Sequence, residues 1–146
     1  MRSNLILMLE ELLISKYLKL ESVKQLFHQD CELLHTTSLI PYPVFINGKN
    51  YTGHTPEIVD SPFLMKYVKE HFYEELNQLE NKPLIIPLGK AVEDVLRIMI
   101  NDNMICEKQC LFGFPHPSGA NGHRKEQFIN NKNKLKETIH DYFKFN

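Results

Sequence analysis

The sequence contains few cysteines, and their number argues against a disulfide framework. Only Cys31, Cys106 and Cys110 occur among its 146 residues. An odd number of thiols is not the pattern of a small disulfide-bonded domain. Cys106 and Cys110 are spaced like half of a metal or iron–sulfur site, but the sequence lacks the other half. We therefore predict free thiols, no metal and no cofactor.

Strong net charge and long apolar runs are also lacking. The formal net charge is −1, which shows no general attraction to nucleic acid but leaves room for a local basic face. The apolar run Leu5–Leu9 is too short to cross a bilayer, and no signal-peptide pattern surrounds it. Length and composition are those of one soluble domain, so we expect a single cytoplasmic domain over residues 1–146 with no membrane partner.

What is present is a hydrophobic pattern that alternates between helical and strand-like segments. Apolar residues at helical spacing predict helices over 4–18, 22–28, 61–79, 90–99 and 124–143, with Ser22 and Ser61 as N-caps. Short apolar runs predict strands over 31–40, 84–88 and 110–114. This order predicts a three-layer α/β/α sandwich with a mainly parallel central sheet. Ligands bind at the carboxyl ends of such strands, so we expect 36–51, 88–90 and 116–123 to line a crevice.

The sequence GFPHPSGANGHR, from Gly113 to Arg124, is the strongest candidate for a functional loop. Two prolines flank His116 and restrain its backbone, which suits an imidazole that meets an oxygen gaining negative charge. The tip that follows has small side chains and can approach a phosphate closely, with Arg124 as a second positive element. The alternative is a simple turn in which His116 caps a strand.

The motif HPSGANGHR, preceded by CLFGF, resembles the His-Pro-Ser loop of the uracil-DNA glycosylase superfamily. PLIIPLGKAVEDVL is similar to the preceding strand, glycine turn and helix of that family, and LLHTTSLIPYPVF to its base-reading strand. The resemblance covers about residues 31–143. It divides the chain into a helical lead-in, 1–30, and a family-like core, 31–146.

The resemblance implies that the chain binds uracil-containing or otherwise damaged DNA and cleaves the N-glycosidic bond of a flipped base. His116 would stabilise the departing base, and Ser118 would hold a flanking phosphate. Thr37 or His35 would read the base. The expected DNA contacts are Ser118, Gly119, Ala120, Asn121, Arg124, Gly89 and Lys90, although Gly89 and Lys90 would alternatively only close a turn.

The family's water-activating motif has no counterpart in this sequence. That motif is a glycine-rich loop with Asp or Asn after the first core strand, whereas residues 1–30 contain neither glycine nor proline. The chain therefore resembles the C-terminal two-thirds of a family domain, and we expect a sandwich truncated at its N-terminus. A dimer partner or complementing chain would then pair with the exposed sheet edge.

Three functions remain open at this point. The first is a glycosylase of base-excision repair, active alone or with the missing part supplied. The second is a non-catalytic member that still binds DNA or a partner. The third is a small α/β interaction protein unrelated to DNA.

Overall fold

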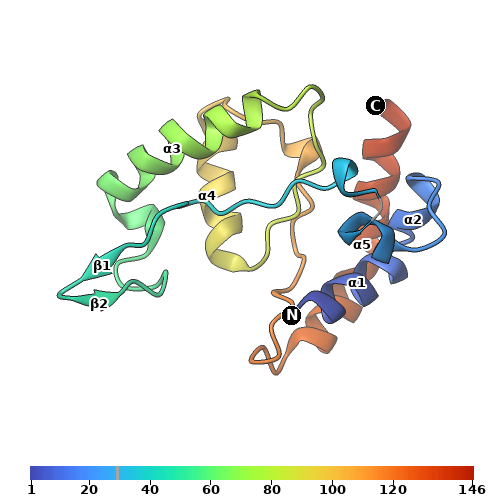
Figure 1. The fold of residues 1–146 in the computed structure, drawn as a ribbon, viewed down its shortest axis with the longest axis horizontal. Helices are drawn as coiled ribbons and strands as arrows, with labels where there is room; N and C mark the ends of the chain where they lie inside the picture. The colour runs from blue at the N-terminus through green and yellow to red at the C-terminus, as the bar shows by residue number, and fades with distance from the viewer. Residues whose placement is uncertain (29) are drawn as a thin grey trace.

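The computed structural model describes residues 1–28 and 30–146, in which helices dominate. Figure 1 shows α1, α2 and α5 grouped at one end of the molecule, and α3, α4 and the β1–β2 hairpin at the other. The α-helices are α1 Arg2–Glu11, α2 Ile14–Tyr17, α3 Pro62–Asn77, α4 Lys90–Asn101 and α5 Arg124–Phe145. The 3₁₀ helices are η1 Val23–Phe27, η2 Cys31–Leu33, η3 Ile58–Asp60 and η4 Glu107–Gln109, and the strands are β1 Phe45–Ile46 and β2 Lys49–Asn50.

Local sequence sets the starts of two helices as predicted. The Ser61 hydroxyl accepts a hydrogen bond from the Leu64 N–H (3.3 Å), and Pro62 occupies the first turn of α3. The Ser22 hydroxyl accepts from the Lys24 N–H (3.2 Å) and caps η1. Both predicted N-caps are confirmed.

The single helix predicted over 4–18 is instead two helices. α1 ends at Glu11, and α2 begins at Ile14 after Leu13 adopts a left-handed conformation with φ +63°. The break turns the chain so that Leu12 and Ile14 are both buried. The helical periodicity of the sequence is continuous over 4–18, so it gives no sign that the helix axis changes direction at Leu13.

The buried side chains form two hydrophobic cores. The first core consists of Met8, Leu9, Leu12, Ile14, Val23, Leu26, Leu111, Phe114, Phe128, Leu135 and Ile139. The second core consists of Leu39, Ile58, Leu64, Met65, Val68, Phe72, Val95, Leu96, Met99, Cys110 and Phe112. The extended residues 110–112 supply both cores, because neighbouring side chains on an extended chain point to opposite faces, and Phe114 returns to the first core after the turn at Gly113. Residues 84–88 behave similarly, since Leu84 and Ile86 pack on the first core and Ile85 packs on the second.

The predicted three-layer sandwich with a parallel central sheet is wrong. The sheet found among residues 1–28 and 30–146 has two antiparallel strands, β1 and β2, in which Phe45 pairs with Asn50 and Ile46 with Lys49. The predicted strands 84–88 and 110–114 run parallel but share a single bridge, Ile85 to Cys110. In that bridge the Ile85 N–H donates to the Gln109 carbonyl (2.7 Å) and the Leu111 N–H to the Ile85 carbonyl (2.8 Å).

The chemistry of Pro87 and Gly113 explains why this pairing stops. Continuing the parallel ladder requires a donor at position 87, and Pro87 has no N–H. On the segment 110–114, the backbone groups of Gly113 are already occupied. The Gly113 N–H donates to Glu93, and the Gly113 carbonyl accepts from Asn131 Nδ2 (2.9 Å). Gly113 also has φ +86°, which ends the extended conformation.

The strand predicted over 31–40 is also absent. Residues 31–33 form η2, and residues 34–40 are extended without a neighbouring strand, crossing from one group of helices to the other (Figure 1). Only Leu39 of this stretch is buried. An apolar run therefore indicates an extended chain here, but a strand also needs a partner with free backbone groups.

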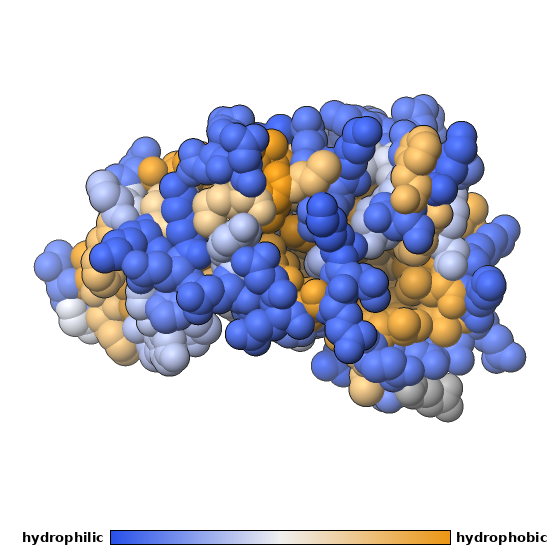
Figure 2. Space-filling view, turned by 90° about the horizontal axis from the view of Figure 1, so that it is seen from above, coloured by the Kyte–Doolittle hydropathy of each residue, from blue (hydrophilic) through white to orange (hydrophobic). Residues whose placement is uncertain are grey.

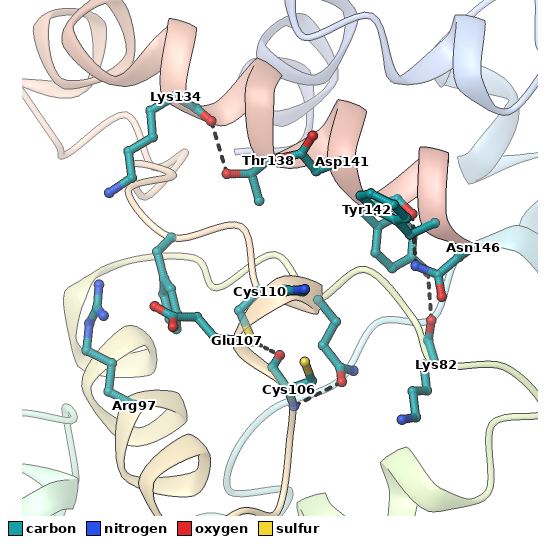
Figure 3. Close-up of a pocket in the computed structure, with 14 residues that line it drawn as sticks. Lys82, Arg97, Cys106, Glu107, Cys110, Lys134, Thr138, Asp141, Tyr142 and Asn146 are labelled. Carbon is teal, nitrogen blue, oxygen red and sulfur yellow. Dashed lines mark hydrogen bonds between the residues drawn. The ribbon is translucent and has the colours of Figure 1, made fainter.

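The surface of the molecule is mixed in polarity and contains a cavity. Figure 2 shows apolar side chains reaching the surface in separate patches among hydrophilic ones. A cavity of about 580 Å³ lies between α4, η4 and the C-terminal half of α5 (Figure 3). In the part of the chain that is described, no helix is long and apolar enough to cross a membrane.

Candidate functional site: the His-Pro-Ser loop

Residues 113–124 form a loop that connects the bridged segment 110–112 to α5. Phe114 is buried and its ring meets that of Phe128 edge-on, with ring centroids 6.4 Å apart. Pro115 and Pro117 are also buried, whereas His116 between them is exposed. The backbone is thus anchored on both sides of a histidine whose imidazole faces solvent.

The imidazole of His116 is held by the loop itself. The Ser118 N–H donates to His116 Nδ1 at 3.2 Å. A ring nitrogen that accepts a hydrogen bond carries no proton, so in the neutral ring the proton lies on Nε2. The loop therefore presents Nε2–H as a hydrogen-bond donor.

Gly89 packs against this histidine. A Cβ placed on Gly89 would lie 3.3 Å from His116 Cδ2 and 3.5 Å from His116 Cβ. Gly89 also has φ +103°, a conformation that side chains other than glycine rarely adopt. The turn before α4 is consequently close enough to limit the positions of the ring.

Three consecutive carbonyls of the loop are each held by a side chain. Asn121 Nδ2 donates to the His116 carbonyl (3.3 Å), and Arg124 Nη1 donates to the Ser118 carbonyl (2.6 Å). The Pro117 carbonyl between them accepts from Asn4 Nδ2 (2.9 Å), which lies on α1, 113 residues away in sequence. We call Asn4, Asn121 and Arg124 the carbonyl clamp.

The tip of the loop is small and exposed. Gly119 and Ala120 are exposed, and a Cβ on Gly119 would have no atom within 4 Å. The Ser118 hydroxyl oxygen accepts the Ala120 N–H (3.1 Å), which leaves the hydroxyl proton available for an external acceptor. The backbone can therefore approach a ligand closely at this tip.

The charged residues predicted to hold phosphate are partly committed elsewhere. Arg124 uses one of its five N–H groups in the carbonyl clamp. Lys90 forms an ion pair with Asp94 one turn further along α4, and Glu93 lies in the first turn of that helix. These carboxylates offset the positive end of the helix dipole. The geometry thus favours Gly89 and Lys90 as a turn rather than as a phosphate site.

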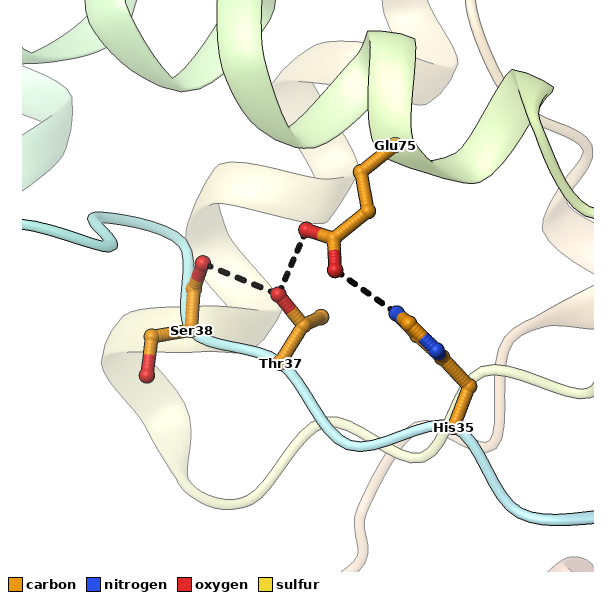
Figure 4. Close-up of polar contacts among 4 residues, drawn as sticks. All are labelled: His35, Thr37, Ser38 and Glu75. Atoms are coloured by element: carbon orange, nitrogen blue, oxygen red, sulfur yellow. Dashed lines mark hydrogen bonds and ion pairs between the residues drawn. The ribbon is translucent and has the colours of Figure 1, made fainter.

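The residues predicted to read the base meet a carboxylate instead. His35 Nε2 lies 2.7 Å from Glu75 Oε1, and the Thr37 hydroxyl donates to Glu75 Oε2 (2.6 Å) (Figure 4). The Thr37 bond is the main cause that lowers the pKa of Glu75; partial burial opposes it, and His35 adds to the lowering. Among residues 1–28 and 30–146, no hydrogen bond connects His35 or Thr37 to the loop at 116–123.

Sequence reasoning missed the partners that hold these segments. Asn4, Glu75, Glu93 and Asn131 each contact a predicted site segment; three of them lie outside the quoted motifs, and Glu93 lies in PLIIPLGKAVEDVL without having been singled out. Polar residues on helices are common, so spacing alone gave no signal for them. Their role depends on which helix packs beside which loop.

The cysteines are unpaired. Cys31 and Cys106 are exposed and Cys110 is buried. Burial raises the pKa of the Cys110 thiol to about 12, so this thiol stays protonated. Within the described part of the chain, no three His, Cys, Asp or Glu residues are grouped to hold a metal ion.

Comparison with known proteins gives one relative and no family assignment. No family model matches the chain, and no solved structure matches it. The chain is 47% identical over 142 residues to the uncharacterized protein YoxB of Bacillus subtilis (strain 168). The match covers 97% of this chain but only 56% of that protein, so the chain spans little more than half of its relative's length.

Proposed function

We propose that this chain is a uracil-DNA glycosylase-like protein of base-excision repair that releases a damaged base from DNA. The observation that carries the proposal is the state of His116, an exposed imidazole with its proton on Nε2, on a loop fixed by buried prolines and the carbonyl clamp. The resemblance of HPSGANGHR to the family's loop supplies the reaction.

In this proposal His116 acts as an electrostatic stabiliser of the leaving group. Cleavage of the N-glycosidic bond leaves negative charge on the base and positive charge on the sugar. The Nε2–H donates to the base oxygen as that charge develops, and the donor needs no reorganisation because Ser118 and Gly89 already hold the ring. Removing one such donor lowers rates by about 10²–10³-fold.

The tip contributes DNA binding in the same proposal. The Ser118 hydroxyl donates to a phosphate next to the flipped nucleotide, and Gly119–Asn121 enter the space that the base leaves. The remaining N–H groups of Arg124 strengthen this contact without leaving the clamp. His35 and Thr37 read the base only if they release Glu75.

The water that attacks the sugar needs its own activating group, and we assign that role to no residue of this chain. The proposal takes two forms. In the first, the isolated chain cleaves the N-glycosidic bond slowly without a water-activating group. In the second, a partner or the rest of a longer protein supplies that group. The longer relative makes this distinction testable. Three free cysteines are in keeping with the cytoplasm as the proposed compartment.

The test is release of uracil from labelled single- and double-stranded DNA by this chain and by the longer B. subtilis relative. His116→Ala is compared with His28→Ala, which removes an exposed histidine at the end of η1. Release that falls about 10²-fold or more in His116→Ala but not in His28→Ala supports the proposal.

Other outcomes distinguish the alternatives. DNA binding that weakens with salt, without release by either protein, supports a non-catalytic DNA-binding member. If neither release nor binding occurs with either protein, the glycosylase proposal is wrong, and an interaction protein unrelated to DNA remains.

A further inference from the structure

The cavity between α4, η4 and α5 has the size of a small-molecule site. Its volume of about 580 Å³ falls within the range of roughly 300–1,000 Å³ that is usual for ligand pockets. No residue of the loop 113–124 lines it. Any function of this cavity is thus separate from that of the His-Pro-Ser loop.

The charged side chains around the cavity are predominantly basic. The basic residues are Lys82, Arg97, Lys108 and Lys134, and the acidic residues are Glu107 and Asp141. Within the described chain, none of these four cations lies in an ion pair with a carboxylate. Unpaired cations around a concave surface attract an anion, because the low-dielectric walls concentrate the potential.

Arg97 is oriented for such an anion. Its guanidinium carbon lies 4.1 Å from the centre of the Phe112 ring. Stacking on an aromatic ring keeps the guanidinium desolvated on one face while its N–H groups stay free in its own plane. Lys134 extends from α5 toward Arg97 in Figure 3, so the two cations approach the cavity from facing helices.

The uncharged part of the lining combines aromatic rings with polar groups and two thiols, Cys106 and Cys110. Phe112, Tyr142 and Phe145 contribute rings. The Tyr142 hydroxyl already donates to the Lys82 carbonyl (2.6 Å), and the Thr138 hydroxyl donates to the Lys134 carbonyl (3.0 Å). The Cys110 thiol is neutral because of its raised pKa. The lining therefore offers ring contacts and cations, together with the free thiol of Cys106.

We infer that this cavity binds a mononucleotide-like ligand, an aromatic ring that carries a phosphate group. The phosphate interacts with Arg97 and Lys134, as a planar guanidinium can bind two phosphate oxygens at once. The ring packs against the aromatic wall near Tyr142 and Phe145. A neutral apolar ligand would leave the cations without a partner, and a DNA duplex is too wide to enter.

The test is isothermal titration calorimetry of the 146-residue chain with deoxyuridine 5′-monophosphate, deoxyuridine and inorganic phosphate. The monophosphate is expected to bind with a Kd below about 1 mM, and deoxyuridine about tenfold or more weakly. Arg97→Gln and Lys134→Gln are each expected to weaken binding by roughly tenfold or more, since each removes a charged contact. Lys125→Gln, at an exposed lysine outside the cavity, serves as the control and is expected to keep the affinity.

Several results would overturn the inference. They are absence of monophosphate binding, equal affinity for phosphate alone, and unchanged affinity in both cavity variants. Loss of binding in His116→Ala instead of Arg97→Gln would place the ligand in the loop. Circular dichroism checks that each variant folds. If Arg97→Gln does not fold, the affinity of Lys134→Gln for the monophosphate decides the question. Uracil release is not a readout here, so failure of the glycosylase proposal leaves this test intact.

Discussion

The conformation of His116 depends on side chains from separate parts of the chain. The flanking prolines restrict the backbone angles, but they supply no donor for the carbonyls of residues 116–118, which accept hydrogen bonds from the carbonyl clamp. Asn121 and Arg124 lie within the motif HPSGANGHR itself, so the sequence of the motif includes two of the three clamp residues. Asn4 is on a different helix and reaches the central carbonyl only because α1 packs beside the loop. The motif was thus visible in the sequence, but its support was not.

Replacing Asn4 with Asp tests the clamp at this central carbonyl. The change keeps the shape but removes the donor to the Pro117 carbonyl, leaving a carboxylate beside a carbonyl oxygen. We expect a loss of about 1 kcal/mol in the free energy of unfolding, and faster amide motion at Gly119 and Ala120. Urea unfolding and NMR relaxation measure the two effects. Asn130→Asp, at an exposed position of α5, is the control, and equal effects of both changes would exclude the clamp.

Gly89→Ala tests the contact between the α4 turn and the imidazole. Alanine at φ +103° is strained, and its Cβ lies 3.3 Å from His116 Cδ2. We expect destabilisation of about 1–2 kcal/mol and shifted NMR signals of the His116 ring. Gly119→Ala is the matched control, because no positive φ and no neighbour within 4 Å oppose its methyl group. If both variants unfold at the same urea concentration, the packing of Gly89 against the His116 ring does not constrain the loop.

At the scale of elements, the helices were more predictable than the strands. The caps at Ser22 and Ser61 act within a few residues of their own helices, so local sequence contains the whole signal. A strand depends on a second segment with matching free backbone groups. Pro87 lacks a donor, and the backbone groups of Gly113 are taken by Glu93 and Asn131. The apolar runs at 84–88 and 110–114 therefore pack between two cores and share one bridge, without forming a sheet.

The N-terminal elements are joined by one carboxylate. Glu10 on α1 accepts hydrogen bonds from the Ser22 hydroxyl (2.6 Å), the Val23 N–H (2.7 Å) and the Ser15 hydroxyl (3.0 Å). Burial raises the pKa of this carboxyl, but the three hydrogen bonds and Lys24 outweigh it and lower the pKa below the ordinary value of 4.5. The ionised form thus holds α1, α2 and η1 together.

This arrangement predicts a pH dependence of stability. Because the folded-state pKa of Glu10 is lower than the unfolded value, its stabilisation is present above pH 4.5 and is lost as the pH falls through the folded-state pKa. Glu10→Gln is expected to cost about 1 kcal/mol at neutral pH and progressively less in acid. Urea unfolding from pH 7 to pH 3 measures the difference. Glu137→Gln, at an exposed carboxylate of α5, is the control; a cost for Glu10→Gln that does not change with pH would rule out this role.

At the scale of the whole molecule, residues 110–114 connect the two cores. Leu111 is fully buried in the first core, and its neighbour Phe112 belongs to the second. Truncating a side chain that packs on one core shifts the backbone of residues 110–114, and the same backbone positions the side chains that pack on the other core. This predicts that the two groups of helices unfold together, although each has its own core.

Leu111→Ala tests that coupling. Loss of a fully buried leucine leaves a cavity, so we expect a decrease of about 2–5 kcal/mol in the free energy of unfolding. Leu7→Ala, at a side chain that is 62% exposed, is expected to change it by less than about 0.5 kcal/mol. Far-UV circular dichroism follows all helices, while the NMR signals of Tyr17 and Tyr67 report on α2 and α3 separately. If both tyrosines in Leu111→Ala lose their native signals at the same urea concentration, the cores are coupled through 110–114. A transition at Tyr17 that precedes the one at Tyr67 would instead show two independent folding units.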